Sequence, residues 1–334
     1  MTVPGTDTIE GRRMPDFFLV GHAKCGTTAL YEGLQPHPQI FMPELKEPYF
    51  FIPEVRTEER WKLFDAPRTL EQYLALFAPA QPGQRVGEAS PHYIWSREAA
   101  AGIAAAEPRA RIVAILREPA SFLRSLHTHL LKSHIETETD LRRALELEGE
   151  RRQGRSIPST SRWPRLLLYS EHVEYAAQLR RFYDAFPAEQ VLVLIYEDFR
   201  RDNRGALEAV LRFLEVDPEA AVAVPESNTT TQQVRRPRLY GALHRISMGD
   251  GPTGRVLRPA IKAVTPRSLR RSTLEAARHR LAMGAPEEPD VKLTVELRHR
   301  FKPEVEAVSE LLDRDLLAKW GYGSSPRSRV AQPR

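Results

Sequence analysis

The sequence contains a single cysteine, Cys25, and no long apolar run. One cysteine excludes an intrachain disulfide, a cysteine-based zinc site and an iron–sulfur cluster, and it indicates a reducing, cytoplasmic setting. No stretch reaches the roughly 18 consecutive apolar residues that a membrane-spanning helix needs. The N-terminal residues MTVPGTDTIEGRR also lack the apolar core of a signal peptide. We therefore expect neither a membrane span nor a secretory signal.

Lysine is scarce too, with 8 residues among 49 basic ones, so 41 are arginines. The net charge is +5, and the hydrophobic (41%) and charged (28%) fractions are typical of a globular protein with a sizeable core. The planar guanidinium group suits phosphate and carboxylate, so the basic surface indicates an anionic ligand, although coding bias alone also produces an arginine-rich composition.

Short apolar runs alternate with helical patterns, which is typical of strand–helix–strand units in a parallel sheet. Residues 17–20, 111–116 and 191–196 are predicted as central strands, and residues 86–88 as a weaker fourth. Apolar residues recur at helical spacing over residues 172–186, 207–214 and 305–316. The prediction is an α/β fold of three layers, in which a central parallel sheet is flanked by helices.

Two segments, residues 149–165 and 225–289, interrupt this pattern. Neither has enough apolar residues for a core of its own, so both are predicted as insertions or lids within one domain that covers residues 16–322. Residues 1–15 and 323–334 are expected to be flexible tails.

The most informative motif is FFLVGHAKCGTTALY, in which an apolar strand leads through a glycine-containing loop into a helical pattern. Glycines allow a tight turn, the first amides of the helix lack intrahelical partners, and Lys24 adds a positive charge. Thr27 and Thr28 add hydroxyl donors at the start of the helix. The loop is therefore predicted to bind phosphate.

A P-loop kinase acting on a small molecule is the alternative interpretation of this loop. In such enzymes the lysine follows the second glycine, whereas Lys24 precedes Gly26. The strand over residues 111–116 is followed by Arg117 and not by the aspartate that would hold magnesium. Both differences favour an anion site that requires no metal.

A second motif, ARIVAILREPASFLRS, places Arg117 at the carboxyl end of a strand and Ser125 two turns into the following helix. Both side chains donate hydrogen bonds to phosphate, and this edge of an open α/β sheet is where ligands bind. Arg117 and Ser125 are therefore predicted to share an anionic ligand with the first loop.

The two motifs in this order resemble the two nucleotide-binding loops of sulfotransferases that use 3′-phosphoadenosine-5′-phosphosulfate (PAPS). The resemblance extends through LKEPYFF, VGEASPHYI, LVLIYEDF and LLDRDLLAKWGY, over residues 16–322. It implies the P-loop-type fold of that family and the transfer of a sulfuryl group from PAPS to a hydroxyl of a carbohydrate, lipid or secondary metabolite. Adenosine 3′,5′-bisphosphate is then the product, and no metal is required.

The resemblance also implies a role for each residue of these motifs. The 5′-phosphosulfate is bound by residues of the first loop: Lys24, Cys25 through its amide, Gly26, Thr27 and Thr28. Arg117 and Ser125 bind the 3′-phosphate, and Tyr196, in LVLIYEDF, approaches the adenine. A late basic segment closes over the cofactor, and its candidate phosphate ligands are Arg235, Arg236 and Arg238.

The resemblance further assigns a base. Glu47, in LKEPYFF, matches the catalytic glutamate of glycosaminoglycan-type sulfotransferases. The acceptor hydroxyl must lose its proton as it attacks sulfur, and a carboxylate beside a cationic loop accepts that proton. Cytosolic small-molecule members use histidine, which makes His92, in VGEASPHYI, the alternative base. Lys24 is expected to stabilise the charge on the leaving group as well.

VGEASPHYI departs from the heparan-type pattern at Ala89, where those members have a lysine that serves an acidic polysaccharide. The absence of this lysine favours a less anionic acceptor, and Glu88, Ser90 and Tyr93 are expected to line the acceptor cleft.

A third hypothesis, nucleic-acid binding through the arginine-rich residues 235–280, gives the phosphate loop no role. We therefore expect no nucleic-acid partner.

Overall fold

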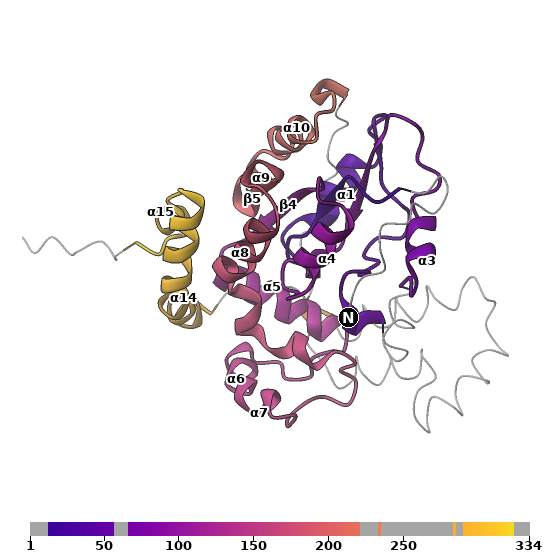
Figure 1. The fold of residues 1–334 in the computed structure, drawn as a ribbon. Helices are drawn as coiled ribbons and strands as arrows, with labels where there is room; N and C mark the ends of the chain where they lie inside the picture. Colours follow the sequence, from indigo (N-terminus) through magenta and orange to yellow (C-terminus); the bar gives the residue numbers. More distant parts are fainter. Residues whose placement is uncertain (1–12, 57–65, 221–232, 235–282, 285–289, 324–334) are drawn as a thin grey trace, which may run out of the picture. The chain divides into compact units, whose positions relative to one another are not determined.

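The computed structural model describes residues 13–56, 66–220, 233–234, 283–284 and 290–323 (Figure 1). The chain forms two compact units. The first unit combines residues 1–122, 170–227 and 291–334, and the second combines residues 123–169 and 228–290.

The first unit is built on a parallel sheet of five strands in the order β2-β3-β1-β4-β5. Their bounds, in that order, are Ile40–Phe41, Arg85–Ala89, Phe17–Leu19, Arg111–Leu116 and Val191–Ile195. In the centre, Leu19 pairs with Ala89 on one side and with Val113 on the other. Because all the strands run parallel, the loops that follow β1, β3, β4 and β5 leave the same edge of the sheet.

Helices flank this sheet. The described helices of the first unit are α1 (Thr27–Leu34), α3 (Leu70–Ala75), α4 (Ala99–Ala106), α8 (Tyr175–Ala185), α9 (Tyr196–Arg201), α10 (Asn203–Phe213), α14 (Val291–Leu312) and α15 (Leu316–Trp320). α4 and α14 both pack against α8, whereas α1 packs against α10. The predicted arrangement of a central parallel sheet flanked by helices is confirmed.

The four strands predicted from apolar runs are also confirmed. Every residue of β1 is buried, as is all of β4 after Arg111, which explains why both strands are continuous apolar runs in the sequence. The strand predicted over residues 191–196 ends one residue early, because Tyr196 begins α9. Glu197 and Asp198 favour a helix start there, since their charges lie at the positive end of the helix dipole.

The apolar stripe predicted over residues 305–316 is divided between two helices. α14 ends at Leu312, and Asp313 then takes a φ of 50°, a left-handed conformation that ends a helix. Asp315 caps α15, and its carboxylate accepts from the Ala318 amide at 2.9 Å.

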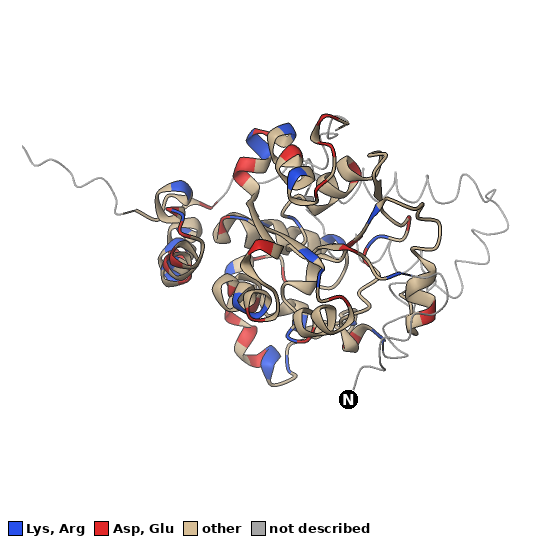
Figure 2. Cartoon of the chain, turned by 45° about the horizontal axis from the view of Figure 1, so that its top comes forward, with Lys and Arg blue, Asp and Glu red and all other residues tan. Residues whose placement is uncertain are grey.

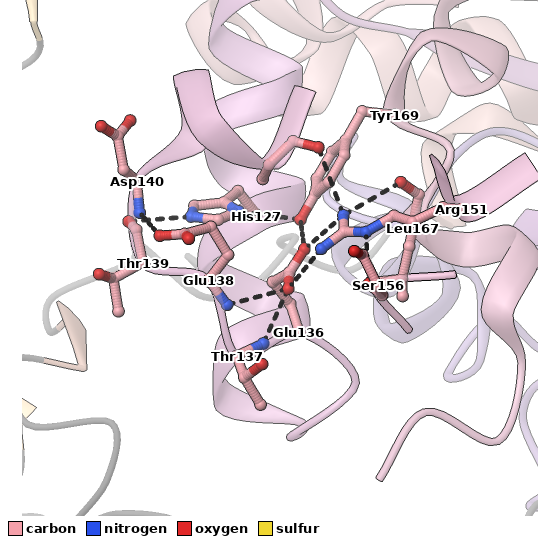
Figure 3. A network of polar contacts seen from close by, with 11 residues as sticks. His127, Glu136, Thr137, Glu138, Thr139, Asp140, Arg151, Ser156, Leu167 and Tyr169 are labelled. Carbon is pink, nitrogen blue, oxygen red and sulfur yellow. Dashed lines mark hydrogen bonds and ion pairs between the residues drawn. The ribbon is translucent and has the colours of Figure 1, made fainter. Parts of the chain in front are cut away.

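The second unit contains α6 (Leu141–Glu146), α7 (Glu148–Arg152) and most of α5 (Pro119–Lys132). A buried ion pair, with Arg151 Nη1 2.8 Å from Glu136 Oε2 and side chains 1% and 0% exposed, lies within it (Figure 3). The Tyr169 hydroxyl donates to the same carboxylate at 3.0 Å, as do two backbone amides to its other oxygen. These partners matter because a buried charge left unpaired costs about 3–5 kcal/mol.

The predicted insertion over residues 149–165 belongs to this unit and begins within α7. Most of the other, residues 225–289, lies outside the described residues, apart from the antiparallel pair β6 (Gln233–Val234) and β7 (Met283–Gly284). The predicted tails also lie outside them, apart from residues 13–15 and 323. The described 3-10 helices are Pro53–Arg56, Pro91–Tyr93, Pro164–Leu167, Tyr169–Val173, Ala188–Gln190 and Pro218–Ala220.

Basic and acidic residues are interspersed along several of the described helices (Figure 2). On α10, Glu208 accepts from Arg204 and Arg212, one turn before and one turn after it, at 3.0 and 3.1 Å. Such exposed pairs contribute little stability each, but they offset part of the positive charge of an arginine-rich chain. None of the described helices combines the length and the apolar character that crossing a bilayer requires.

Candidate functional site

The loop between β1 and α1 makes the tight turn that its two glycines predict. Gly26 precedes α1 with a φ of 92°, and a Cβ there would lie 3.0 Å from the Phe199 ring. At Gly21 a Cβ would lie 2.5 Å from the backbone nitrogen of Ile115. No side chain caps α1, so its first amides are available to an anion at the helix start.

Cys25 fills the interior of this loop. Its side chain is 0% exposed, and burial raises the pKa of the thiol well above its usual range. The Cys25 amide donates to the His22 carbonyl at 3.2 Å. The thiol is therefore held protonated, and its position is structural. In α1, Thr27 is buried, whereas Thr28 is partly exposed.

Arg117 joins this loop to the end of β4. Its Nη1 donates to the Lys24 carbonyl at 2.9 Å, and its guanidinium lies over the Tyr196 ring at 4.6 Å from the centroid. Lys24 itself has a φ of 69°, outside the range that most residues adopt. Burial lowers the pKa of Lys24, and the positive charge of Arg117 lowers it further. The structure therefore brings Lys24, Arg117 and Tyr196 together at one cationic site.

Arg117 also contacts a hydroxyl of its own motif, and the predicted role of Ser125 stays a prediction. Arg117 Nε donates to Ser121 Oγ at 3.0 Å. Ser125 lies one turn further along α5 and is partly exposed. Ser121 is the first hydroxyl residue after Arg117 in REPASFLRS, and this short spacing was the sequence signal that could have identified it as a partner of Arg117.

Glu47 lies in a loop that continues beside the end of β3. Its side chain is 35% exposed, and it accepts hydrogen bonds from Lys46 Nζ and the Tyr49 hydroxyl. Burial acts to raise the pKa of Glu47, but the charge of Lys46 and the two hydrogen bonds outweigh it, so the pKa lies below its usual value. Lys46 also lowers the pKa of Lys24, which places the carboxylate and the cationic site near each other.

His92, the alternative base, belongs to the same cluster. The His92 ring lies 5.5 Å from the Tyr49 ring, centroid to centroid. Burial lowers the pKa of His92 to about 4, although the charge of Glu47 acts in the opposite direction. A neutral imidazole and a carboxylate therefore both lie next to Tyr49, a residue that the sequence patterns did not single out.

The prediction that Glu88, Ser90 and Tyr93 line an acceptor cleft is wrong, because all three are 0% exposed. Glu88 accepts from Ser90 Oγ at 2.5 Å and from the Tyr93 hydroxyl at 3.1 Å. Burial raises the pKa of Glu88 to about 7, although the hydrogen bonds from its hydroxyl donors act to lower it.

Arg235, Arg236 and Arg238 lie outside the described residues, so their role stays a prediction.

The model of the sulfotransferase family matches residues 15–220, more than half of the chain. The chain belongs to the sulfotransferase family. Mouse carbohydrate sulfotransferase 15 is 26% identical over 280 residues, which cover 67% of this chain and 49% of the relative. Mouse heparan sulfate glucosamine 3-O-sulfotransferase 3A1 is 29% identical over 215 residues, covering 63% and 49%. The chain thus spans about half the length of the curated relatives it matches.

A solved sulfotransferase from Alicyclobacillus acidocaldarius is 27% identical to this one, with a TM-score of 0.66. The similarity covers 92% of this chain and 99% of that one, and it confirms the predicted P-loop-type fold of three layers. In the described part of this sulfotransferase, no group of three or more His, Cys, Asp or Glu side chains is placed to hold a metal ion.

Trp320 and Tyr322 of this sulfotransferase lie beyond the matched residues and contact the segments that follow β4 and β5. The Tyr322 hydroxyl donates to the carboxylate of Glu118, the residue after Arg117, at 3.0 Å. Trp320 Nε1 donates to the carboxylate of Glu197, the residue after Tyr196, at 2.9 Å. Glu197 in turn accepts from the Glu118 amide at 3.1 Å. These contacts tie the two segments to each other and to the end of the described chain.

Proposed function

We propose that this sulfotransferase transfers the sulfuryl group of PAPS to a hydroxyl of a carbohydrate, lipid or secondary-metabolite acceptor. The observation that carries the proposal is the position of Lys46, which pairs with Glu47 and lies close enough to Lys24 to lower its pKa. A carboxylate is thus held beside a cationic anion-binding loop. In-line sulfuryl transfer needs a general base and a group that stabilises the leaving group, and Glu47 and Lys24 can fill these two roles.

In this mechanism Lys24 and the first amides of α1 bind the 5′-phosphosulfate. Arg117 and Ser125 bind the 3′-phosphate, and Tyr196 approaches the adenine. Glu47 accepts the proton of the acceptor hydroxyl as its oxygen bonds to sulfur, while the bond from sulfur to the bridging oxygen breaks. Lys24 stabilises the negative charge that develops on the departing adenosine 3′,5′-bisphosphate, so no metal is required.

Two features support a weakly anionic acceptor. Ala89 stands where heparan-type members have a lysine. Near the Glu47 carboxylate, Tyr49 and His92, which is neutral at pH 7 because its pKa is about 4, add no positive charge to that of Lys46. A less anionic acceptor, such as a small sugar, lipid or secondary metabolite, therefore suits this site better than an acidic polysaccharide.

Calorimetric titration without magnesium tests the proposed donor. We expect adenosine 3′,5′-bisphosphate to bind at least about tenfold more tightly than the 5′-monophosphate, because charge-assisted hydrogen bonds to the 3′-phosphate contribute about 1.5–3 kcal/mol. Arg117→Ala should remove most of that difference. Arg109→Ala is the control, since that side chain is 94% exposed and precedes β4 at the opposite edge of the sheet.

Failure of both adenosine phosphates to bind would contradict the proposal. Binding only of a nucleoside triphosphate with magnesium would favour the kinase alternative, although family membership and the arginine at the end of β4 both argue against it.

The pH dependence of turnover provides a second test. Lys46→Met removes the charge that does most to offset burial at Glu47, so the pKa of Glu47 should rise. A base is active when deprotonated, and turnover falls as the pH drops through its pKa. The acid limb of the kcat profile should therefore move to higher pH in Lys46→Met. An unchanged limb, or one displaced to lower pH, would show that Lys46 does not control the base.

A further inference from the structure

The loop that carries Glu47 has an unusual backbone. Glu47 has a φ of 64° and Tyr49 a φ of 51°, both in the left-handed region. Residues other than glycine are rarely found there, and such conformations persist only where the surrounding structure holds them in place. The position of the proposed base therefore depends on what holds residues 47–51.

Three backbone amides of alternate residues hold this loop. The Glu47 amide donates to the Ala89 carbonyl at 2.9 Å. The Tyr49 amide donates to Ser90 Oγ at 3.1 Å, and the Phe51 amide to the Tyr93 hydroxyl at 3.2 Å. Two of the three acceptors are thus side-chain hydroxyls, which can turn either a proton or a lone pair toward the loop.

Glu88 decides which way these hydroxyls point. Ser90 donates to Glu88 Oε1 at 2.5 Å, and Tyr93 donates to Glu88 Oε2 at 3.1 Å. Above its pKa of about 7, Glu88 is a carboxylate that only accepts. Each hydroxyl has one proton, so both protons are then committed to Glu88. The remaining lone pairs then face the amides of Tyr49 and Phe51. Because Glu88 is 0% exposed, water does not compete for these hydrogen bonds.

We propose that Glu88 is a positioning residue for the base: by orienting the hydroxyls of Ser90 and Tyr93, its carboxylate holds residues 47–51 and thereby places the Glu47 carboxylate at the reacting oxygen. This inference rests on the proposed function. It goes beyond that function because it explains how a buried carboxylate holds the backbone of the loop, whichever donor and acceptor the enzyme uses.

The chain offers a matched pair of variants. Tyr73 and Tyr93 are both 0% exposed, and both donate to Glu88 Oε2, at 2.5 and 3.1 Å. Of these two tyrosines, only Tyr93 also accepts a hydrogen bond from a backbone amide of the loop, that of Phe51. Tyr93→Phe removes the donor and the acceptor, whereas Tyr73→Phe removes the donor alone. The ring of residue 73, which stacks on Phe50 at 4.3 Å, is kept in Tyr73→Phe.

The experiment compares kcat, bisphosphate affinity and amide hydrogen exchange among wild type, Tyr73→Phe, Tyr93→Phe and Glu88→Gln at pH 8.5. We expect Tyr93→Phe and Glu88→Gln to lower kcat by about 10- to 100-fold, since small displacements of a catalytic group have effects of this size. Affinity for adenosine 3′,5′-bisphosphate should stay within about twofold, because the nucleotide loops keep their contacts. Tyr73→Phe should change kcat by less than about threefold.

Amide exchange keeps the test informative even without an acceptor assay. The amides of Tyr49 and Phe51 should exchange faster in Tyr93→Phe than in Tyr73→Phe. Equal effects of the two tyrosine variants on kcat and exchange, or a parallel loss of kcat and bisphosphate affinity, would overturn the inference. A wild-type protein that binds no bisphosphate would overturn the proposed function instead, and if Glu88→Gln does not fold, the tyrosine pair still decides.

Discussion

Glu47→Gln should lower kcat by at least about 100-fold while leaving the affinity for adenosine 3′,5′-bisphosphate within about twofold of wild type. Glutamine keeps the shape of the side chain but does not accept a proton from the acceptor hydroxyl. Lys24 and Arg117, the proposed nucleotide ligands, lie in other loops, so ground-state binding of the donor should persist. Turnover and calorimetric titration, measured on the same preparation, separate these two quantities.

His92→Gln is the comparison that assigns the base. Since the rings of His92 and Tyr49 lie 5.5 Å apart and Tyr49 contacts Glu47, either variant disturbs the same cluster. The base is the residue whose replacement removes the acid limb of the pH profile along with the rate. Near-normal turnover in Glu47→Gln, together with a large loss in His92→Gln, would transfer the role to His92.

Lys24→Met should lower kcat at saturating donor by about 100- to 1000-fold, the effect of removing a charge that stabilises a developing anion. Methionine keeps much of the length of the side chain and removes its charge. The expected loss lies in kcat because negative charge grows on the bridging oxygen as the bond to sulfur breaks. Steady-state kinetics over a range of donor concentrations measure it.

Lys46→Met is the control for Lys24→Met, because Lys46 pairs with Glu47 and has no assigned contact with the leaving group. At a pH above its acid limb, Lys46→Met should keep kcat within about tenfold of wild type. If Lys24→Met raises KM and leaves kcat unchanged, Lys24 binds donor and transition state equally and does not stabilise the leaving group.

The parts of the fold that the sequence predicts are those with a local signal. β1 and β4 are buried over nearly their whole length, so a continuous apolar run marks each of them. β2, with two residues, is too short to show any period. The break between α14 and α15 depends on a left-handed Asp313 and the cap at Asp315, and the apolar stripe continues across both.

The site follows the same rule. Lys24 and Gly26 lie in one loop whose spacing is visible in the sequence, and Arg117 marks a strand end. The mistake about Glu88 has a physical cause: polar residues at the end of a strand indicate a cleft only if nothing covers them. Here Tyr73, from α3, donates to Glu88, and both side chains are fully buried. The hydrophobic pattern of the sequence does not reveal the contact between Tyr73 and Glu88.

The contacts of Tyr322 and Trp320 link the end of the described chain to the segments that follow β4 and β5. The family match ends at residue 220, yet the carboxylates of Glu118 and Glu197 take hydrogen bonds from residues about 100 positions further along. A fragment cut at that boundary would leave both carboxylates without these donors, next to Arg117 and Tyr196. The compact unit that holds Glu118 and Glu197 therefore takes part of its hydrogen bonding from residues beyond the matched segment.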